Sequence, residues 1–229
     1  MKRFYKTVEV EQKQAGWSVL LDGKAIKTPA KKALLLPGKS LAKTIAYEWD
    51  TQEQEIQPLA MPMMRLAATT LDQIKKERDK HLDALSAYAS TDLLCYRSQA
   101  SGLAERQSQY WDPWLVWAKE SLGLSLVITE GIMPVHQAET IPMRAHTLLS
   151  RLDNWQLAAH LVLIQSTGSF VLGLAVAQGQ LNAAEASMLA DIEADFQSEL
   201  WGEEPEAQAV KASKSRDIFE AARFLQLLY

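Results

Sequence analysis

Cysteine is almost absent from this 229-residue chain, in which Cys95 is the single example. A lone cysteine cannot form an internal disulfide and cannot by itself provide a tetrahedral metal site, so we expect a protein of a reducing compartment. Its apolar neighbours predict a small buried hydrophobe, because a reactive thiol needs an electropositive and partly exposed setting. The basic N-terminal segment 1–6 leads into an alternating stretch and not into an apolar run, so it is not a secretory signal.

The sequence also lacks the signatures of the common catalytic sites. Gly168, Gly173 and Gly179 lie in an apolar stretch and not between a strand and a helix, which excludes a glycine-rich phosphate loop. The histidines are scattered, and none has the spacing of a helical metal pair; His160 is expected to be a hydrogen-bonded core residue. We therefore predict no catalytic residues, no metal site and no cofactor.

The formal net charge of -4 gives no global electrostatic reason to bind nucleic acid or an anionic membrane. One uncharged stretch, Trp155 to Gln178, has the length of a membrane span. It contains glutamine, histidine, serine and threonine, and no basic residues flank it in the pattern that sets orientation. We therefore predict a single buried helix that ends at Gly179 as a C-terminal cap, and no stable membrane insertion.

The strand signals lie within the first forty residues. Two alternating segments precede Asp22-Gly23, a favoured two-residue hairpin turn, a third strand is predicted at 24–27, and a short apolar run follows at 34–36. From about residue 40 the apolar spacing is mostly helical, apart from a brief alternation from Leu124 to Thr129 that is compatible with an isolated strand. The sequence thus predicts a two-domain α+β protein: a β-rich N-terminal domain over residues 1–80, an antiparallel β-meander with helices, and an α-helical bundle over residues 81–229.

Charge is distributed unevenly along the chain. Residues 1–47 carry ten basic and three acidic side chains, whereas residues 183–206 carry eight acidic side chains and no basic one. We predict one amphipathic helix from Asn182 to Trp201, with Leu189, Ile192 and Phe196 facing the core and with Glu185 and Glu193 projecting at similar angles. An acidic face can be simply solvated, or paired within the chain with the N-terminal lysines, or it can dock a basic partner. The candidate partner-binding residues are Glu193, Asp195, Glu199 and Glu185.

The tryptophans are assigned to packing. Trp49 ends an apolar stripe that contains Leu41 and Ile45, so we expect it to pack a helix against the N-terminal sheet. Trp111 recurs with Trp114 and Trp117 at a three-residue spacing, for which core packing is the default interpretation.

An ordered set of motifs runs from residue 3 to about residue 207: Arg3-Phe4-Tyr5-Lys6, Leu21-Asp22-Gly23-Lys24, Lys27-Thr28-Pro29, Glu48-Trp49-Asp50-Thr51-Gln52, Met61-Pro62, Thr91-Asp92-Leu93-Leu94-Cys95-Tyr96-Arg97, Gln107, Trp111-Asp112-Pro113, Phe196-Gln197 and Trp201-Gly202-Glu203. Together they resemble the assembly chaperones of the F-type ATP synthase head that act on its alpha subunit, found in mitochondria and in alphaproteobacteria. The resemblance implies a β-rich domain followed by a helical one, and it adds Trp201 to the structural tryptophans. It also implies a role that is not enzymatic, in which the chaperone holds the free alpha subunit until the beta subunit replaces it.

The start at Met1, two residues before the first motif, predicts a bacterial cytoplasmic protein, or a mitochondrial matrix protein if the chain is a processed mature form. Ala194 stands where relatives often carry a further acid, which bears on the composition of the docking face.

Two other classes of function stay open at this point. One is a small-ligand enzyme of an unrecognised class, and the other is a nucleic-acid binder that uses the lysine-rich N-terminal meander.

Overall fold

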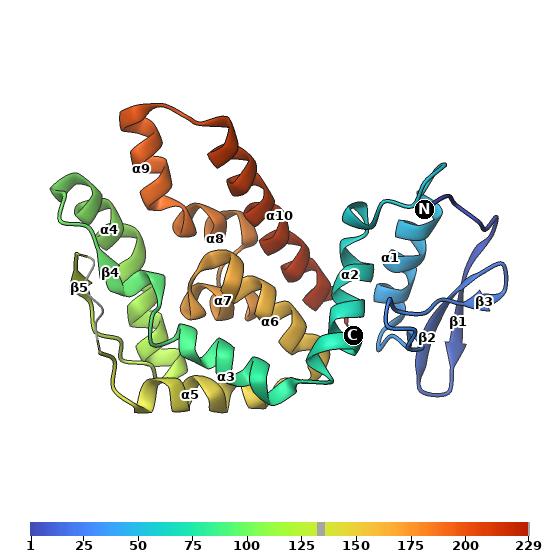
Figure 1. Cartoon of the computed structure of the whole chain (residues 1–229). Helices are drawn as coiled ribbons and strands as arrows, with labels where there is room; N and C mark the ends of the chain where they lie inside the picture. Colours follow the sequence, from blue (N-terminus) through green and yellow to red (C-terminus); the bar gives the residue numbers. More distant parts are fainter. Residues whose placement is uncertain (132–135, 229) are drawn as a thin grey trace. The chain divides into compact units, whose positions relative to one another are not determined.

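The computed structural model describes residues 1–131 and 136–228 and has the predicted α+β fold, with an antiparallel sheet at the N-terminus followed by helices (Figure 1). The strands are β1 (Val8–Lys13), β2 (Gly16–Leu21), β3 (Lys24–Ala25), β4 (Tyr96–Arg97) and β5 (Thr129–Glu130). The helices are α1 (Lys39–Asp50), α2 (Pro62–Thr69), α3 (Arg78–Tyr88), α4 (Ser101–Trp117), α5 (Thr140–Ser150), α6 (Asn154–Thr167), α7 (Phe170–Ala177), α8 (Ala183–Ala190), α9 (Ile192–Trp201) and α10 (Pro205–Leu227). Short 3₁₀ or π turns occupy Pro58–Ala60, Thr70–Ile74, Leu93–Cys95 and Ala118–Leu122.

The N-terminal sheet has the order β1-β2-β3, and its second hairpin forms at the predicted turn. Asp22 and Gly23 both have positive φ, 47° and 74°, and Leu21 pairs with Lys24 across them. Positive φ at both central residues is the requirement of a type I′ turn, which explains the Asp-Gly pair. The predicted run at 34–36 does not extend the sheet as a strand, because it contributes only isolated bridges.

Helix α1 packs in this first part of the chain with Leu41 and Ile45 fully buried. At its last turn the buried carboxylate of Glu48 accepts hydrogen bonds from the amides of Met63 and Met64, at 2.7 and 2.8 Å. These amides lie in the first turn of α2, where N–H groups have no acceptor within the helix. Glu48 therefore caps α2 although it belongs to α1. Trp49 is half-buried, and its ring meets Tyr5 edge-to-face with 5.6 Å between centroids.

One long helix predicted from the sequence is divided into two in the structure. The stretch from Trp155 to Gln178 forms α6 and α7, which are separated at Gly168, where φ is +65°. Ser169 then begins α7 by accepting a hydrogen bond from the amide of Leu172. The expected burial is confirmed, because every residue from Phe170 to Val176 is buried. Gly179, with φ of +70°, follows the end of α7 as predicted.

The chain divides into two compact units. The first contains Met1–Arg78, Asn154–Ala159 and the residues from Arg223 onward, and the second contains Asp79–Asp153 and His160–Ala222. The predicted ranges, 1–80 and 81–229, do not include the two later segments in the first unit. Within that unit the rings of Trp155 and Phe224 lie 6.3 Å apart, which shows how residues distant in sequence join one core.

Over the described ranges, no helix combines the length and the hydropathy required to cross a bilayer.

Candidate docking surface

The acidic segment folds as two helices, α8 and α9, which meet at Asp191, so the prediction of one continuous helix is wrong. Glu185 and Glu193 therefore do not share one helix axis, and the inference that they project at similar angles fails. A long-range contact accompanies the break: the indole Nε1 of Trp111 donates to the carbonyl of Leu189 at 2.9 Å. That carbonyl lies in the last turn of α8, where acceptors have no helical partner, and the indole satisfies it. Trp111, 1% exposed, thus has the predicted structural role.

Asn182 accepts a hydrogen bond from the amide of Glu185 and begins α8, as the sequence predicts for the start of this segment. The expected apolar side of the two helices is present, because Leu189 and Ile192 are buried and Phe196 is half-buried. Glu185, Glu193 and Glu199 are exposed.

Two of the four candidate carboxylates are engaged inside the second unit. Glu199 forms a bidentate ion pair with Arg106 of α4, with both N–O distances at 2.9 Å, and Arg106 also lies over the ring of Phe196. The hydrogen bonds from Arg106 lower the pKa of Glu199. Asp195 pairs with Lys211 of α10. These partners come from within the same unit and are not the N-terminal lysines.

The other two candidates, Glu185 and Glu193, are exposed, and neither makes an ion pair within the described residues. Their carboxylates are therefore available to a partner. Between them in sequence, Asp191 is buried, and burial raises its pKa although Lys214 and Lys211 act in the opposite direction. We call the set formed by Glu185, Glu193, Asp195, Glu199, Glu203, Glu204 and Glu206 the acidic surface.

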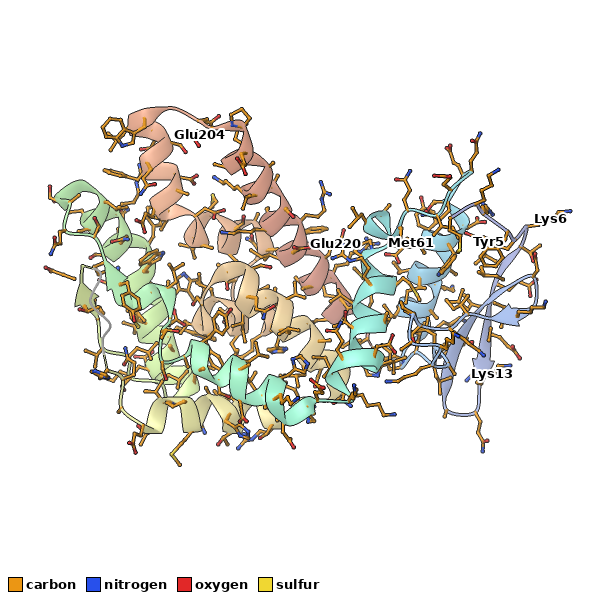
Figure 2. The ribbon with its side chains drawn as sticks, in the orientation of Figure 1. Tyr5, Lys6, Lys13, Met61, Glu204 and Glu220 are labelled. Atoms are coloured by element: carbon orange, nitrogen blue, oxygen red, sulfur yellow. The ribbon has the colours of Figure 1, made fainter. Side chains whose placement is uncertain are left out.

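The structural role predicted for Trp201 is wrong. Its side chain is 86% exposed, because α9 ends at Gly202, with φ of +89°, and every residue from Glu199 to Val210 is exposed. Leu200 beside it is 62% exposed. Figure 2 shows Glu204 in the turn that joins α9 to α10, so this projecting end combines acidic side chains with two large apolar ones. Large exposed apolar groups rimmed by charge are typical of protein–protein contact sites.

The remaining groups with unusual environments have structural partners. Asp92 is fully buried and caps the start of α7, and burial raises its pKa to about 6. Burial also raises the pKa of the Cys95 thiol to about 12, so it is the inert buried cysteine that the sequence predicts. Arg97, also buried, pairs with Asp112 at 2.8 Å and lies over the Trp111 ring. Sequence reasoning did not assign roles to Asp92 and Arg97, although a charged residue at each end of an apolar run was a usable signal.

Within the part of the chain that the structure describes, no group of three or more histidine, cysteine, aspartate or glutamate side chains is arranged to hold a metal ion. His160 is buried, as expected, and has an interaction partner.

Comparison with known proteins decides the family. A family model described as ATP12 chaperone protein matches residues 2–119, which is just over half of the chain. The chain belongs to the ATP12 chaperone family. This result confirms the resemblance found in the ordered motifs, and it identifies an ATP synthase assembly chaperone and not an enzyme.

Individual relatives agree along the whole length. The mitochondrial protein atp12 of Schizosaccharomyces pombe is 28% identical over 222 residues, with 91% of this chain and 76% of the relative covered. The crystal structure of Atp12 from Paracoccus denitrificans is 36% identical, covers 100% of this chain and 98% of its own, and superposes with a TM-score of 0.95. A mutant of that protein, in which one aspartate is replaced by lysine, gives the same TM-score. The Atu1473 protein of Agrobacterium tumefaciens is 37% identical, with a TM-score of 0.94 over 100% of this chain and 86% of its own.

Proposed function

We propose that this ATP12-family chain binds the free alpha subunit of the ATP synthase head and prevents its aggregation until the beta subunit replaces it. Family membership and the ordered motifs support an assembly role. An orphan subunit exposes apolar surface that would otherwise be buried, and covering it is a physical requirement of assembly. The chaperone needs no cofactor or nucleotide turnover for this.

The observation that carries the proposal is α9 itself: Glu193 in its first turn is exposed without an ion pair among the described residues, and Leu200 and Trp201 at its end are exposed apolar side chains. Carboxylates that are not paired with a basic side chain of the described residues attract a basic patch on a partner and speed association. Glu193 is the main contact and Glu185, in the first turn of α8, is a second one, whereas Asp195 and Glu199 contribute less because each is paired with a basic side chain of the same unit. Trp201 and Leu200 supply the apolar contact, since exposed tryptophans frequently dominate binding energy.

Light scattering of the isolated alpha subunit tests the function directly. An equimolar amount of this chain should suppress aggregation without ATP, and added beta subunit should release the alpha subunit. Unchanged aggregation at that ratio would refute the proposal.

Glu193→Lys tests the surface. Glu193 is exposed, so the substitution should change the free energy of unfolding by no more than about 0.5 kcal/mol. Affinity for the alpha subunit should fall by about tenfold or more, because a repulsive charge replaces an attractive one. The matched control is Glu120→Lys, which makes the same charge change at an exposed site just after the end of α4. Equal affinity in the two variants would remove the acidic surface from the mechanism.

We infer that the protein acts in the bacterial cytoplasm or in the mitochondrial matrix. The three similar solved structures reported above come from Paracoccus denitrificans and Agrobacterium tumefaciens, which are bacteria, and the Schizosaccharomyces pombe relative is named as mitochondrial. Fractionation with an antibody against the chain tests this location.

A further inference from the structure

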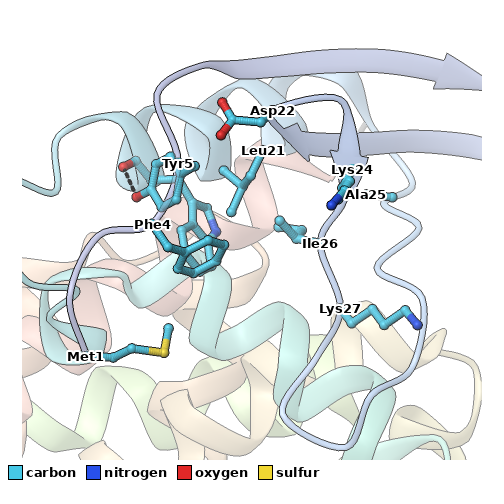
Figure 3. Close-up of a pocket in the computed structure, with 10 residues that line it drawn as sticks. Met1, Phe4, Tyr5, Leu21, Asp22, Lys24, Ala25, Ile26 and Lys27 are labelled. Atoms are coloured by element: carbon cyan, nitrogen blue, oxygen red, sulfur yellow. Dashed lines mark hydrogen bonds between the residues drawn. The ribbon is translucent and has the colours of Figure 1, made fainter.

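The first unit contains a groove that the acidic surface does not involve. Its volume is about 480 Å³, and its walls are largely apolar and aromatic, formed by Phe4, Tyr5, Leu21, Ile26 and Trp49. Figure 3 shows Met1 and Phe4 on one side of the hollow and the segment from Lys24 to Lys27 on the other. The volume is sufficient for one or two large side chains of a bound polypeptide.

One wall of the groove is an exposed aromatic ring. Phe4 is 65% exposed although its neighbour Tyr5 is buried, and the two rings meet edge-to-face with 5.3 Å between centroids. Tyr5 is fixed in turn by a hydrogen bond from its hydroxyl to the carbonyl of Trp49, at 2.6 Å. The groove is therefore preformed, with a phenyl face left in solvent that a bound apolar side chain would cover.

The basic side chains that line the groove outnumber the acidic one. Asp22 is the one acidic residue of its lining, and its carboxylate already accepts hydrogen bonds from the amides of Lys6 and Thr7 and from the Thr7 hydroxyl. Lys24 and Lys27 also line the groove, and neither makes an ion pair in the part of the chain that the structure describes. An occupant with carboxylates would neutralise these ammonium groups, whereas a basic occupant would be repelled.

The ring of Trp49 completes the aromatic lining, while its indole Nε1 is buried and is not open to an occupant of the groove.

We propose that this groove is a second docking site, which binds an acidic polypeptide segment carrying an aromatic or branched aliphatic anchor residue. The anchor side chain lies against Phe4 between the walls, and flanking carboxylates pair with Lys24 and Lys27. The charge preference is opposite to that of the acidic surface, so the two sites recognise different segments. The proposal for this groove does not assume that the alpha subunit is the protein bound there. Its peptide-binding test can therefore fail or succeed independently of the aggregation test of the proposed function.

The probe is a fluorescein-labelled peptide, Asp-Glu-Asp-Phe-Leu-Glu-Asp, titrated with the full chain and followed by fluorescence anisotropy. Binding should saturate and weaken with salt, as expected for a contact that includes charge pairs. Phe4→Ala and Lys24→Glu should each lower affinity by about tenfold. The matched controls are Tyr47→Ala, an equally exposed aromatic of the same unit, and Lys13→Glu, at the far end of β1; both should bind as the parent chain does.

Two further probes identify alternative occupants. A peptide with alanines in place of Phe-Leu tests the anchor, and a single-stranded oligonucleotide tests general anion binding. No saturable binding, equal binding by the Phe4→Ala variant, equal binding of the alanine peptide, or tighter binding of the oligonucleotide would each overturn the proposal. The melting temperature of each variant, measured alongside, verifies that Phe4→Ala and Lys24→Glu remain folded.

Discussion

Replacing Asp92 with asparagine probes the most deeply buried carboxylate described in the chain. Its oxygens accept hydrogen bonds from the Ser169 hydroxyl at 2.8 Å and from the amides of Leu94 and Val171 at 3.0 Å each. Asparagine keeps one acceptor oxygen but turns an amino group toward one of these donors. A buried donor left without an acceptor costs about 1–3 kcal/mol. At about pH 4 the Asp92→Asn variant should therefore be less stable than the parent chain.

The pH dependence of this difference has a defined sign. Desolvation raises the pKa of Asp92 from 3.8 to about 6 in the folded protein, despite the opposing hydrogen bonds. Between these two values the folded state binds more protons than the unfolded state, so the contribution of Asp92 to stability falls as pH rises. The difference between the two pKa values corresponds to about 3 kcal/mol, fully present below the unfolded value and lost above the folded one. Asparagine does not titrate, so the stability gap between the parent chain and the variant should shrink by up to this amount from about pH 4 to pH 7.

Urea unfolding of both proteins across this range gives the required free energies, and subtracting one curve from the other removes the contributions of all other groups. Glu120→Gln, an exposed carboxylate replaced by its amide, should give a gap near zero that changes little with pH. A gap that widens or stays constant as pH rises for Asp92→Asn would refute the assignment of desolvation as the dominant effect.

Two further substitutions test packing. Trp49→Arg should lower the free energy of unfolding by about 2 kcal/mol, which is less than the loss for a fully buried aromatic because Trp49 is only half-buried. The melting temperature of the variant should fall by about 4–8 °C. A melting temperature unchanged within about a degree would show that the indole contributes no packing. Gly173→Ala should lower the free energy of unfolding by about 1–3 kcal/mol, because the added Cβ would lie 2.7 Å from Cγ1 of Ile164. The control Gly102→Ala should be neutral or stabilising, because the nearest atom to its added Cβ is at 3.7 Å. Chemical denaturation of the pair measures both, and equal effects would contradict the close-approach argument.

Elements specified by short-range chemistry were predictable from the sequence. The Asp22-Gly23 hairpin follows from the positive φ that its turn demands, and the helical period after residue 40 follows from apolar spacing. The burial of Cys95 follows from its apolar neighbours, and that of Trp111 follows from its three-residue spacing with Trp114 and Trp117. The ordered motifs predicted the family, because they preserve local features of relatives that share this fold.

The division of the long helices was not predictable, because the decisive partners lie far away in sequence. Asp92 binds the start of α7 from 79 residues earlier, and Trp111 binds the end of α8 across 78 residues. Periodicity reports which side of a helix is apolar, but it carries no information on a capping group that another segment supplies.

For the candidate docking surface, the sequence by itself determined that an acidic run without basic residues exists, and only the tertiary structure decided which carboxylates are free. Glu199 and Asp195 are paired with Arg106 and Lys211, while Glu193 is exposed without an ion pair among the described residues. The sequence likewise shows Trp201 within a family motif, but its 86% exposure depends on where α9 ends relative to its neighbours. Local composition sets the charge of a segment, whereas pairing and exposure depend on contacts between segments that only the folded chain brings together.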